Sequence, residues 1–230
     1  MRYKDAWAYQ ETLLSENVQL KSLRFEQQAN EEEAATAAAN TKNHLLFVEH
    51  PHVYTLGKSG HIENVLLSEE NLAARGIDFF RTNRGGDITY HGPQQLVGYP
   101  ILDLEKFYTD IGKYLRNLEE VIIQTIAHYG LKGERSAGET GVWLDPDKIG
   151  RERKIAAIGV RTSRWVTMHG FALNVNTDLD YFGFIVPCGI QNKQVTSIEK
   201  ELGQQVDINE VKAFFKKHFE DIFEVELVHS

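Results

Sequence analysis

The chain has 230 residues, of which 42% are hydrophobic and 25% are charged, and its formal net charge of −8 argues against binding nucleic acid over the whole surface. Cys188 is its single cysteine, which excludes an internal disulfide and a multi-cysteine metal site. No apolar run approaches the roughly 20 residues of a membrane-spanning helix, and Met1–Asp5 does not begin a signal peptide, so we expect a cytoplasmic protein with no membrane contact.

The first half of the chain predicts one long helix and then short strands. Apolar residues recur at helical spacing from Ala6 to about Gln28, whereas Glu31–Asn40 is rich in Glu and Ala and has little to bury. We expect a mobile connection or a frayed helix end there. Strands are predicted at 45–48, 53–56, 77–81 and 96–102, with a turn at 57–60 and a short helix from Ser68 to Gly76. Pro100 favours a strand edge or a strand end.

The second half predicts two amphipathic helices around further strands. Apolar residues at helical spacing follow Asp110 as far as Gly130, and Asp207 can cap a final helix over 208–223. Strands are predicted at 141–144, 154–161 and 166–175. We find no internal repeat and no linker that demands a boundary, so we expect a single domain over 1–230. The pattern favours an α+β fold, with helices packed on a mixed or antiparallel sheet.

Arg84–Pro93 gathers three glycines, a cation, a hydroxyl, a phenol and an imidazole into ten positions. Glycines allow a backbone to approach a ligand closely and to point N–H groups at it. A hairpin with Gly85-Gly86 at its corner would explain the glycines but not the polar side chains. The segment matches neither common phosphate-binding glycine motif. We therefore favour a functional loop.

Cys188 lies between Pro187 and Gly189, in a segment expected to turn sharply and to present the thiol. A free cysteine is more often a small buried hydrophobe. A reactive thiol also needs a neighbouring base or cation, because an unperturbed pKa of about 8.5 leaves few thiolates near neutrality. The position alone therefore favours an inert cysteine.

Lys154 begins the apolar run Ile155–Val160. If its side chain points into such surroundings, desolvation makes it a competent base or proton shuttle. If it lies at the mouth of the strand, it reaches solvent, which is the commoner fate of a lysine. By itself the sequence favours the second alternative.

His169 is a third candidate, because it precedes Gly170 in a predicted strand, where a ligand can come close. His50 and His52 flank a proline without a nearby carboxylate or cysteine. They fall short of a zinc signature. We interpret them as structural residues or as part of a ligand-facing loop, and we predict no metal site.

Together these segments resemble the lipoyl(octanoyl) transferase family. The resemblance runs through residues 45–203. Its motifs are LLFVEHP (45–51), YTLG (54–57), RGGxxTYHGP (84–93), QLVxYP (95–100), GVW (141–143), KIAAIG (154–159), HGxALNV (169–175), PCGI (187–190), TS (196–197) and ELG (201–203). One departure is Gln94, where the family often has glycine. The Glu31–Asn40 stretch and the C-terminal helix lie outside the recognisable motifs.

The resemblance implies a fold similar to the catalytic domains of lipoate and biotin protein ligases. It implies that Cys188 is the acyl acceptor of a thioester intermediate and that Lys154 is its partner, with no cofactor. From its position beside Gly170, we expect His169 to be an accessory residue. The implied donor is octanoyl-acyl carrier protein, and the implied acceptors are lipoyl domains of 2-oxoacid dehydrogenases and the glycine cleavage H protein. The implied substrate-binding residues are Arg84, Gly85, Gly86, Asp87, Ile88, Thr89, Tyr90, His91, Ala157, Ile158, Gly159, Gly170, Phe171 and Ala172.

Two other functions stay open at this point, and a cysteine hydrolase is a weaker third alternative. An ATP-dependent lipoate or biotin protein ligase of the same fold would activate its acid as an adenylate and would need no thiol. A non-catalytic protein that binds acyl carrier protein or lipoyl domains would form no covalent adduct. For an acidic carrier we expect a basic patch near the thiol, formed by Lys58, Arg151 and Arg153.

Overall fold

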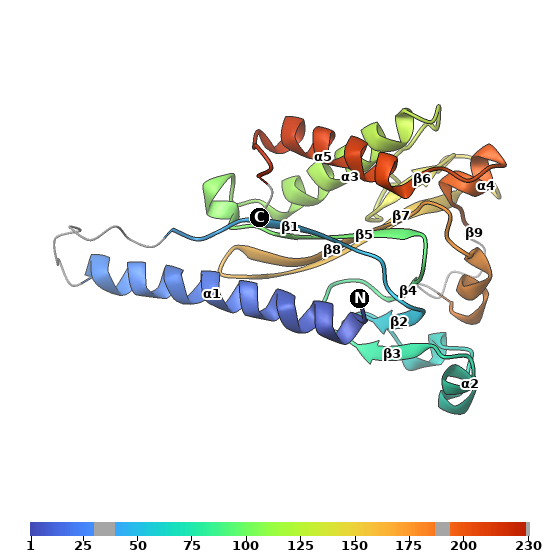
Figure 1. The fold of residues 1–230 in the computed structure, drawn as a ribbon, viewed down its shortest axis with the longest axis horizontal. Helices are drawn as coiled ribbons and strands as arrows, with labels where there is room; N and C mark the ends of the chain where they lie inside the picture. The colour runs from blue at the N-terminus through green and yellow to red at the C-terminus, as the bar shows by residue number, and fades with distance from the viewer. Residues whose placement is uncertain (30–39, 187–193, 229–230) are drawn as a thin grey trace.

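The computed structural model describes residues 1–29, 40–186 and 194–228, and for 26–29 it describes only the helical backbone. Two sheets and the helices packed on them form this part of the chain (Figure 1). The helices are α1 (Tyr3–Ala29), α2 (Glu69–Ala74), α3 (Ile111–Ala127), α4 (Ile198–Leu202) and α5 (Ile208–Phe223), with short 3-10 helices η1 (Ile62–Asn64), η2 (Leu104–Lys106) and η3 (Leu179–Phe184). None of the helices in these described ranges combines the length and the apolar character needed to cross a membrane.

The strands form a larger and a smaller sheet. They are β1 (His44–Val48), β2 (Val53–Leu56), β3 (Asp78–Arg81), β4 (Ile88–His91), β5 (Gln95–Ile101), β6 (Val142–Leu144), β7 (Arg153–Ser163), β8 (Val166–Asn174) and β9 (Gln194–Val195). The larger sheet has the order β1-β5-β8-β7-β6, is antiparallel along this path, and adds β9 parallel to β7. In the smaller sheet, β2 runs parallel to β3 and antiparallel to β4. The expected α+β fold is confirmed.

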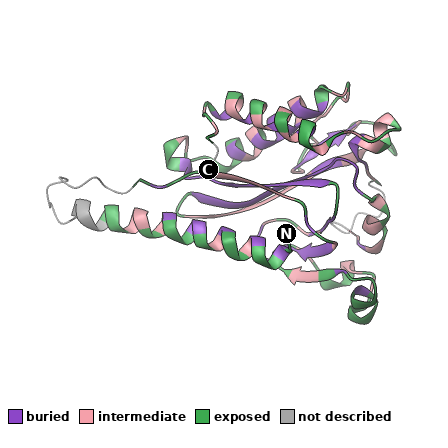
Figure 2. Cartoon of the chain, in the orientation of Figure 1, coloured by how far each residue is buried: buried purple, intermediate pink, exposed green. Residues whose placement is uncertain are grey.

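Helices cover the larger sheet on both faces. α3 and α5 lie on one face and α1 lies along the other (Figure 1). Because side chains alternate along a strand, Leu96 of β5 joins the core under α3 and α5, whereas Val97 and Tyr99 pack on the α1 side. Figure 2 shows β5 and its neighbour β8 as buried. Full burial of one such side chain contributes about 1.5–3 kcal/mol.

Most predicted elements are confirmed to within a few residues. The helix expected from Ala6 begins at Tyr3, and the Asp207 side chain caps α5 by accepting from the backbone N–H of Asn209. The predicted connection Glu31–Asn40 lies, apart from Asn40, outside the described residues. The single domain over 1–230 stays a prediction.

The four residues of strand β4 lie in the segment that the sequence predicts as a loop. Tyr54 and Thr55 of β2 pair with Tyr90 and Thr89 of β4, and the Tyr90 side chain is fully buried in the core of the smaller sheet. A four-residue segment shows almost no periodicity. Pairing with a strand far upstream decides its conformation.

Of the two positions predicted for Pro100, the strand end is right and the sheet edge is wrong. β5 lies between β1 and β8, and Pro100 is its penultimate residue. The ladder between β5 and β8 ends at Gly98, and beyond it the hydroxyl of Thr167 donates to the carbonyl of Pro100 at 2.8 Å. The missing N–H of Pro100 therefore falls where β8 has stopped pairing with β5.

Candidate functional site

A cavity of about 490 Å³ lies between the two sheets and the start of α1. This volume is typical of sites for small molecules. The walls come from β5, β7 and β8 of the larger sheet and from the loop and strand over 84–91 of the smaller sheet, with further residues at 138–140, 143 and 194–195. Both sheets are therefore needed to enclose the site.

Glycines allow the loop between β3 and β4 to dock on β7. The backbone N–H of Gly85 donates to the carbonyl of Val160 at 2.9 Å. A Cβ atom on Gly159 would lie 2.9 Å from the carbonyl oxygen of Gly85 and 3.2 Å from Cδ of Arg84. These distances leave no room for a side chain at residue 159. Gly159 thus permits the contact that closes this side of the cavity.

Arg84 is a buried cation in the cavity wall. Its guanidinium donates to the carbonyl of Thr55 at 2.6 Å, to the hydroxyl of Thr55 at 2.9 Å and to the carbonyl of Gly85 at 3.0 Å. Burial lowers its pKa. The hydrogen bonds to β2 and to its own loop hold the Arg84 side chain in one position beside the cavity.

His50 and His91 form a buried aromatic cluster with Tyr3 and Tyr99 at one end of the cavity. The Nδ1–H of His50 donates to the carbonyl of Met1 at 2.9 Å, so its Nε2 accepts from the Tyr99 hydroxyl at 2.7 Å. The Tyr3 ring stacks on His91 at 6.0 Å between centroids. Burial lowers the pKa of His50 to about 4 and that of His91 to about 3. Both imidazoles are therefore neutral at pH 7.

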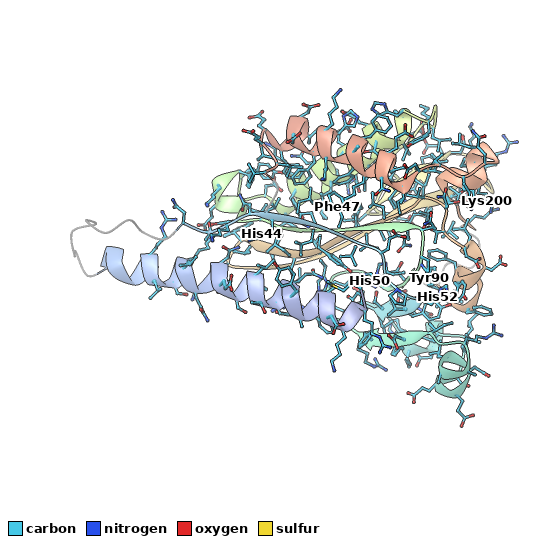
Figure 3. All side chains as sticks on the ribbon, in the orientation of Figure 1. His44, Phe47, His50, His52, Tyr90 and Lys200 are labelled. Atoms are coloured by element: carbon cyan, nitrogen blue, oxygen red, sulfur yellow. The ribbon has the colours of Figure 1, made fainter. Side chains whose placement is uncertain are left out.

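The histidines around Pro51 both have hydrogen-bond partners within the protein. His52 Nδ1 forms a hydrogen bond of 2.7 Å with the hydroxyl of Tyr90, and the His52 ring stacks on Tyr181. Figure 3 shows His50, His52 and Tyr90 close together at one end of the molecule. The described residues contain no group of three potential ligands that could hold a metal ion.

His169 lies in the cavity wall on β8 with a backbone φ of +58°. Its backbone N–H donates to Gln10 Oε1 at 2.9 Å, and its Nε2 lies 2.8 Å from Asn83 Oδ1. Its Nδ1 is buried and has no hydrogen-bond partner among the described residues. Burial lowers the pKa of His169 to about 3, helped by the charge of Arg84, which keeps this side chain neutral.

Lys154 lies in the cavity wall on β7, between β6 and β9. Its Nζ is 4.6 Å from the centre of the Trp143 ring, close enough for a cation–π contact. The residue is half-buried, so its environment lies between the two that its sequence position left open. Cys188 lies outside the described residues.

The cavity brings together most of the predicted substrate-binding residues. Arg84–Thr89, His91, Ala157–Gly159 and Gly170–Ala172 all line it, together with Lys154 and His169. Tyr90 does not line it, because β4 directs this side chain into the core of the smaller sheet. The roles of all these residues in binding stay predictions.

Several lining residues were not assigned to the site from the sequence. Gln95, Val97 and Tyr99 follow each other on one side of β5, and period-two alternation would have found them once Val97 was placed. Trp143 and Tyr3 come from β6 and from the first turn of α1. Tyr3 carries no local signal, because only the packing of α1 brings it to the cavity.

Gln94, the departure from the family pattern, has a φ of +61°. It follows Pro93 in the turn closed by the N–H of Gln95 on the carbonyl of Gly92 at 3.3 Å. Glycine is favoured at such a position, so the departure places a strained residue there. The Gln94 side chain accepts from Asn176 Nδ2 at 2.8 Å, which partly offsets the strain.

The basic patch expected from Lys58, Arg151 and Arg153 is incomplete. Lys58 and Arg151 are exposed. The Arg153 guanidinium is paired with Glu201 at 2.6 Å and with Asp145 at 2.7 Å. Its charge is neutralised by these carboxylates, so Arg153 is not available to an acidic partner.

Comparison with known proteins shows which sequences and folds this chain is similar to. Residues 2–220 match the family model of the lipoyl protein ligase A/B catalytic domain. The chain is 58% identical over 231 residues to an octanoyltransferase of Christiangramia forsetii, covering 99% of this chain and 94% of that protein. It is 58% identical over 229 residues to an octanoyltransferase of Flavobacterium johnsoniae, covering 98% of this chain and 94% of that protein.

Two solved structures share the fold. One is a bipartite lipoate protein ligase from Thermoplasma acidophilum, with a TM-score of 0.66 and 17% identity, covering 93% of this chain and 82% of that one. The other is a lipoate-protein ligase A bound with ATP, with a TM-score of 0.66 and 17% identity over 82% of this chain and 76% of that one. At such identity the likeness concerns the fold alone.

Proposed function

The chain belongs to the lipoyl protein ligase A/B catalytic domain family and, within it, to the octanoyltransferases, and we propose that it transfers an octanoyl group from acyl carrier protein to a lysine of a lipoyl domain. The observation that carries the proposal is the presence of Lys154 in the wall of a cavity that the predicted substrate-binding segments also line. Cys188 is the proposed nucleophile.

The first step loads the enzyme. The Cys188 thiolate attacks the carbonyl carbon of the octanoyl thioester, a new C–S bond forms, and the C–S bond to the carrier's thiol breaks. The proton of Cys188 passes to the departing thiolate by way of Lys154. Covalent catalysis of this kind replaces one difficult transfer by two easier steps.

The second step unloads it. The ε-amine of the acceptor lysine attacks the enzyme thioester, a C–N bond forms, and the C–S bond to Cys188 breaks. Lys154 takes the proton from the amine and returns it to the thiolate. The first step exchanges one thioester for another of similar stability, and the second forms an amide, which is more stable than a thioester, so neither step needs ATP.

The position of Lys154 supports this role. Lys154 pairs with Val195 of β9, and β9 directly follows the segment that contains Cys188 in the chain. A cation beside a thiol stabilises the thiolate and lowers the thiol pKa. The Trp143 ring at 4.6 Å and the backbone pairing on both sides of β7 restrict where the Lys154 ammonium can go.

The cavity wall along β7 is longer than a medium-chain acyl group. Six residues separate Lys154 from Val160 on β7, which corresponds to ~20 Å at about 3.3 Å per residue. An extended chain advances by that rise for every three bonds, so the seven C–C bonds of an octanoyl group span ~8 Å. Ala157 and Ala172 face each other midway and leave room for it.

Mass spectrometry of the intact protein tests the proposal. Incubation with octanoyl-acyl carrier protein, without ATP, adds one octanoyl group that hydroxylamine removes. Because Cys188 is the only cysteine, such a labile thioester can form nowhere else. Cys188→Ala gives no adduct and no transfer to a lipoyl domain.

Other results would identify the rival functions. Full transfer by Cys188→Ala that depends on ATP and magnesium would indicate a ligase. Tight binding of octanoyl-acyl carrier protein by the wild type, with no adduct and no transfer, would indicate a non-catalytic binding protein.

A further inference from the structure

The edge of β7 changes its pairing partner close to Lys154. β8 pairs with β7 from Ser163 back to Ala156 and no further. At Arg153 and Lys154, β6 stays on one edge of β7, so β9 takes the edge that β8 leaves. The backbone of Lys154 therefore lies at a seam between β8 and β9.

β9 is too short to be held by its own ladder. It has two residues, whereas an ordinary strand has roughly three to ten. Around it, the N–H of Gln194 lies 3.4 Å from the carbonyl oxygen of Glu152, and the N–H of Thr196 donates to the carbonyl of Lys154 at 3.0 Å. Side chains outside the ladder are needed to hold such a strand in place.

Thr196, directly after β9, receives these side-chain contacts. It is fully buried, its hydroxyl donates to Glu201 Oε1 at 2.6 Å, and its carbonyl accepts from Asn174 Nδ2 at 2.9 Å. Glu201 in turn pairs with Arg153 of β7. Of these contacts, that of Asn174 is the one that joins Thr196 to β8 and closes the seam.

The orientation of the Asn174 amide follows from its neighbours. The carbonyl of Tyr90 can only accept, so the Gln95 atom 3.1 Å from it is the Nε2 donor. The same Nε2 donates to Asn174 Oδ1 at 2.9 Å, which directs Asn174 Nδ2 at the Thr196 carbonyl. Asn174 is buried in the cavity wall, where loss of this donor would leave the carbonyl of Thr196 without its partner.

We propose that Asn174 is a positioning residue for the transfer reaction: it holds β9 on the backbone of Lys154 and so sets the distance between the Lys154 ammonium and the Cys188 thiol. β9 connects the two groups, because it pairs with Lys154 and continues the segment that carries Cys188. The inference rests on the proposed function, since the same two groups carry out the transfer.

Asn174→Ala is the first test. Without its anchor β9 shifts, and a shift of about 1 Å between reacting groups slows single-turnover acylation by about tenfold to a hundredfold. KM for octanoyl-acyl carrier protein changes less than kcat, because the lost contact acts on the reacting groups. The pKa of the Cys188 thiol, measured by the pH dependence of alkylation, rises toward its unperturbed value near 8.5 as the Lys154 charge moves away.

Hydrogen exchange of the Thr196 N–H reports on β9 without any substrate. This N–H donates to the carbonyl of Lys154, and its exchange rate depends on local opening. In Asn174→Ala it exchanges faster by about tenfold or more. Asn174→Asp keeps the size of the side chain and the acceptor for Gln95 but lacks the N–H donor. It therefore shows the same slower acylation and faster exchange, and it serves if Asn174→Ala does not fold.

Asn176→Ala is the matched control, two residues further along the chain. Asn176 is also buried, and its Nδ2 donates to the carbonyl of Val206 at 2.8 Å, so the substitution again removes a side-chain donor from a backbone carbonyl. Val206 lies between α4 and α5 and not beside β9. The control loses stability but keeps kcat, the thiol pKa and the exchange rate of Thr196.

The results separate a positioning role from a merely structural one. If Asn174→Ala loses stability while kcat, the thiol pKa and the Thr196 exchange rate keep their wild-type values, or if Asn176→Ala loses as much kcat, the positioning role is wrong. A higher KM at unchanged kcat would make Asn174 a contact of the acyl chain and would also overturn the proposal. If the wild type transfers no octanoyl at all, the proposed function itself fails, whereas the exchange of Thr196 still tests the anchor.

Discussion

At the scale of single residues, Lys154 can act as a positive charge and as a carrier of protons. Substitutions at this position can separate the two roles. Its ammonium lies against the Trp143 ring in a half-buried wall, so its charge acts at close range. It can also carry a proton from the Cys188 thiol to the carrier's departing thiolate, and from the acceptor amine back to Cys188. Arginine retains the charge but cannot act as a base near neutrality, whereas methionine retains neither function.

We expect Lys154→Arg to lower the rate of acylation by about a hundredfold, the typical size of one proton-transfer contribution. Lys154→Met is slower still and shifts the Cys188 thiol pKa toward its unperturbed value near 8.5, because the neighbouring charge is lost. Single-turnover acylation gives the rates, and the pH dependence of alkylation by iodoacetamide gives the thiol pKa.

Lys148→Met is the control, since the Lys148 side chain is 60% exposed and pairs with Asp145 in the loop before β7. It changes neither quantity. Equal rates for the wild type and Lys154→Arg would rule out proton transfer by Lys154, and an unshifted thiol pKa in Lys154→Met would rule out its electrostatic role.

At the scale of elements, a buried carboxylate of α3 holds the segment that borders the cavity beside Lys154. Glu119 is fully buried and accepts from the N–H of Gly141 at 3.0 Å, while Arg116 and Arg135 donate to its other oxygen. Gly138, Glu139 and Thr140 line the cavity in this segment. Through Glu119, helix α3 thus positions the segment 138–141 at the border of the cavity.

Glu119→Ala leaves the N–H of Gly141 buried without an acceptor, which costs about 1–3 kcal/mol in the free energy of unfolding. Glu120→Ala is a matched control on the next residue, whose partly exposed side chain pairs with Arg135 at 2.6 Å. An ion pair of that kind contributes about 0–1 kcal/mol.

Urea denaturation measures both free energies. The Glu119→Ala variant also raises KM for the acyl donor more than the control does, because the cavity border loses its anchor. Equal losses of stability in the two variants would contradict a special role for Glu119.

At the scale of the whole molecule, three buried imidazoles come from distant parts of the chain: His91 and His169 line the cavity, and the ring of His50 lies 5.9 Å from that of His91. Burial lowers their pKa values to about 4, 3 and 3, below the usual value near 6.5. The unfolded chain therefore binds more protons than the folded one below pH 6.5. Above that pH the imidazoles are neutral in both states, so the fold pays no penalty for burying them.

We expect the free energy of unfolding to fall as the pH is lowered from 6.5 to 4.5, by up to about 1.4 kcal/mol per pH unit for each of the three histidines. Urea denaturation at pH 7.0, 6.0 and 5.0 measures the slope. Replacing the exposed His61 by glutamine leaves the slope unchanged. A free energy that stays constant over this range would show that the three imidazoles take up no protons on unfolding.

The sequence alone determined what depends on neighbours along the chain. Helical spacing predicted α3 and α5, runs of β-forming residues predicted most strands, and motifs in order gave the family and the residues proposed for its chemistry. These signals are local because propensity, capping and alternation act over a few residues.

The tertiary structure decided what depends on residues that are distant in sequence. β4 is a strand because β2 lies beside it, and Tyr3 reaches the cavity because α1 packs against the sheet. The His169 ring on β8 is held by Asn83, whose amide in turn donates to Glu11 on α1. No local pattern records such contacts, since packing and hydrogen bonding select partners by position in space.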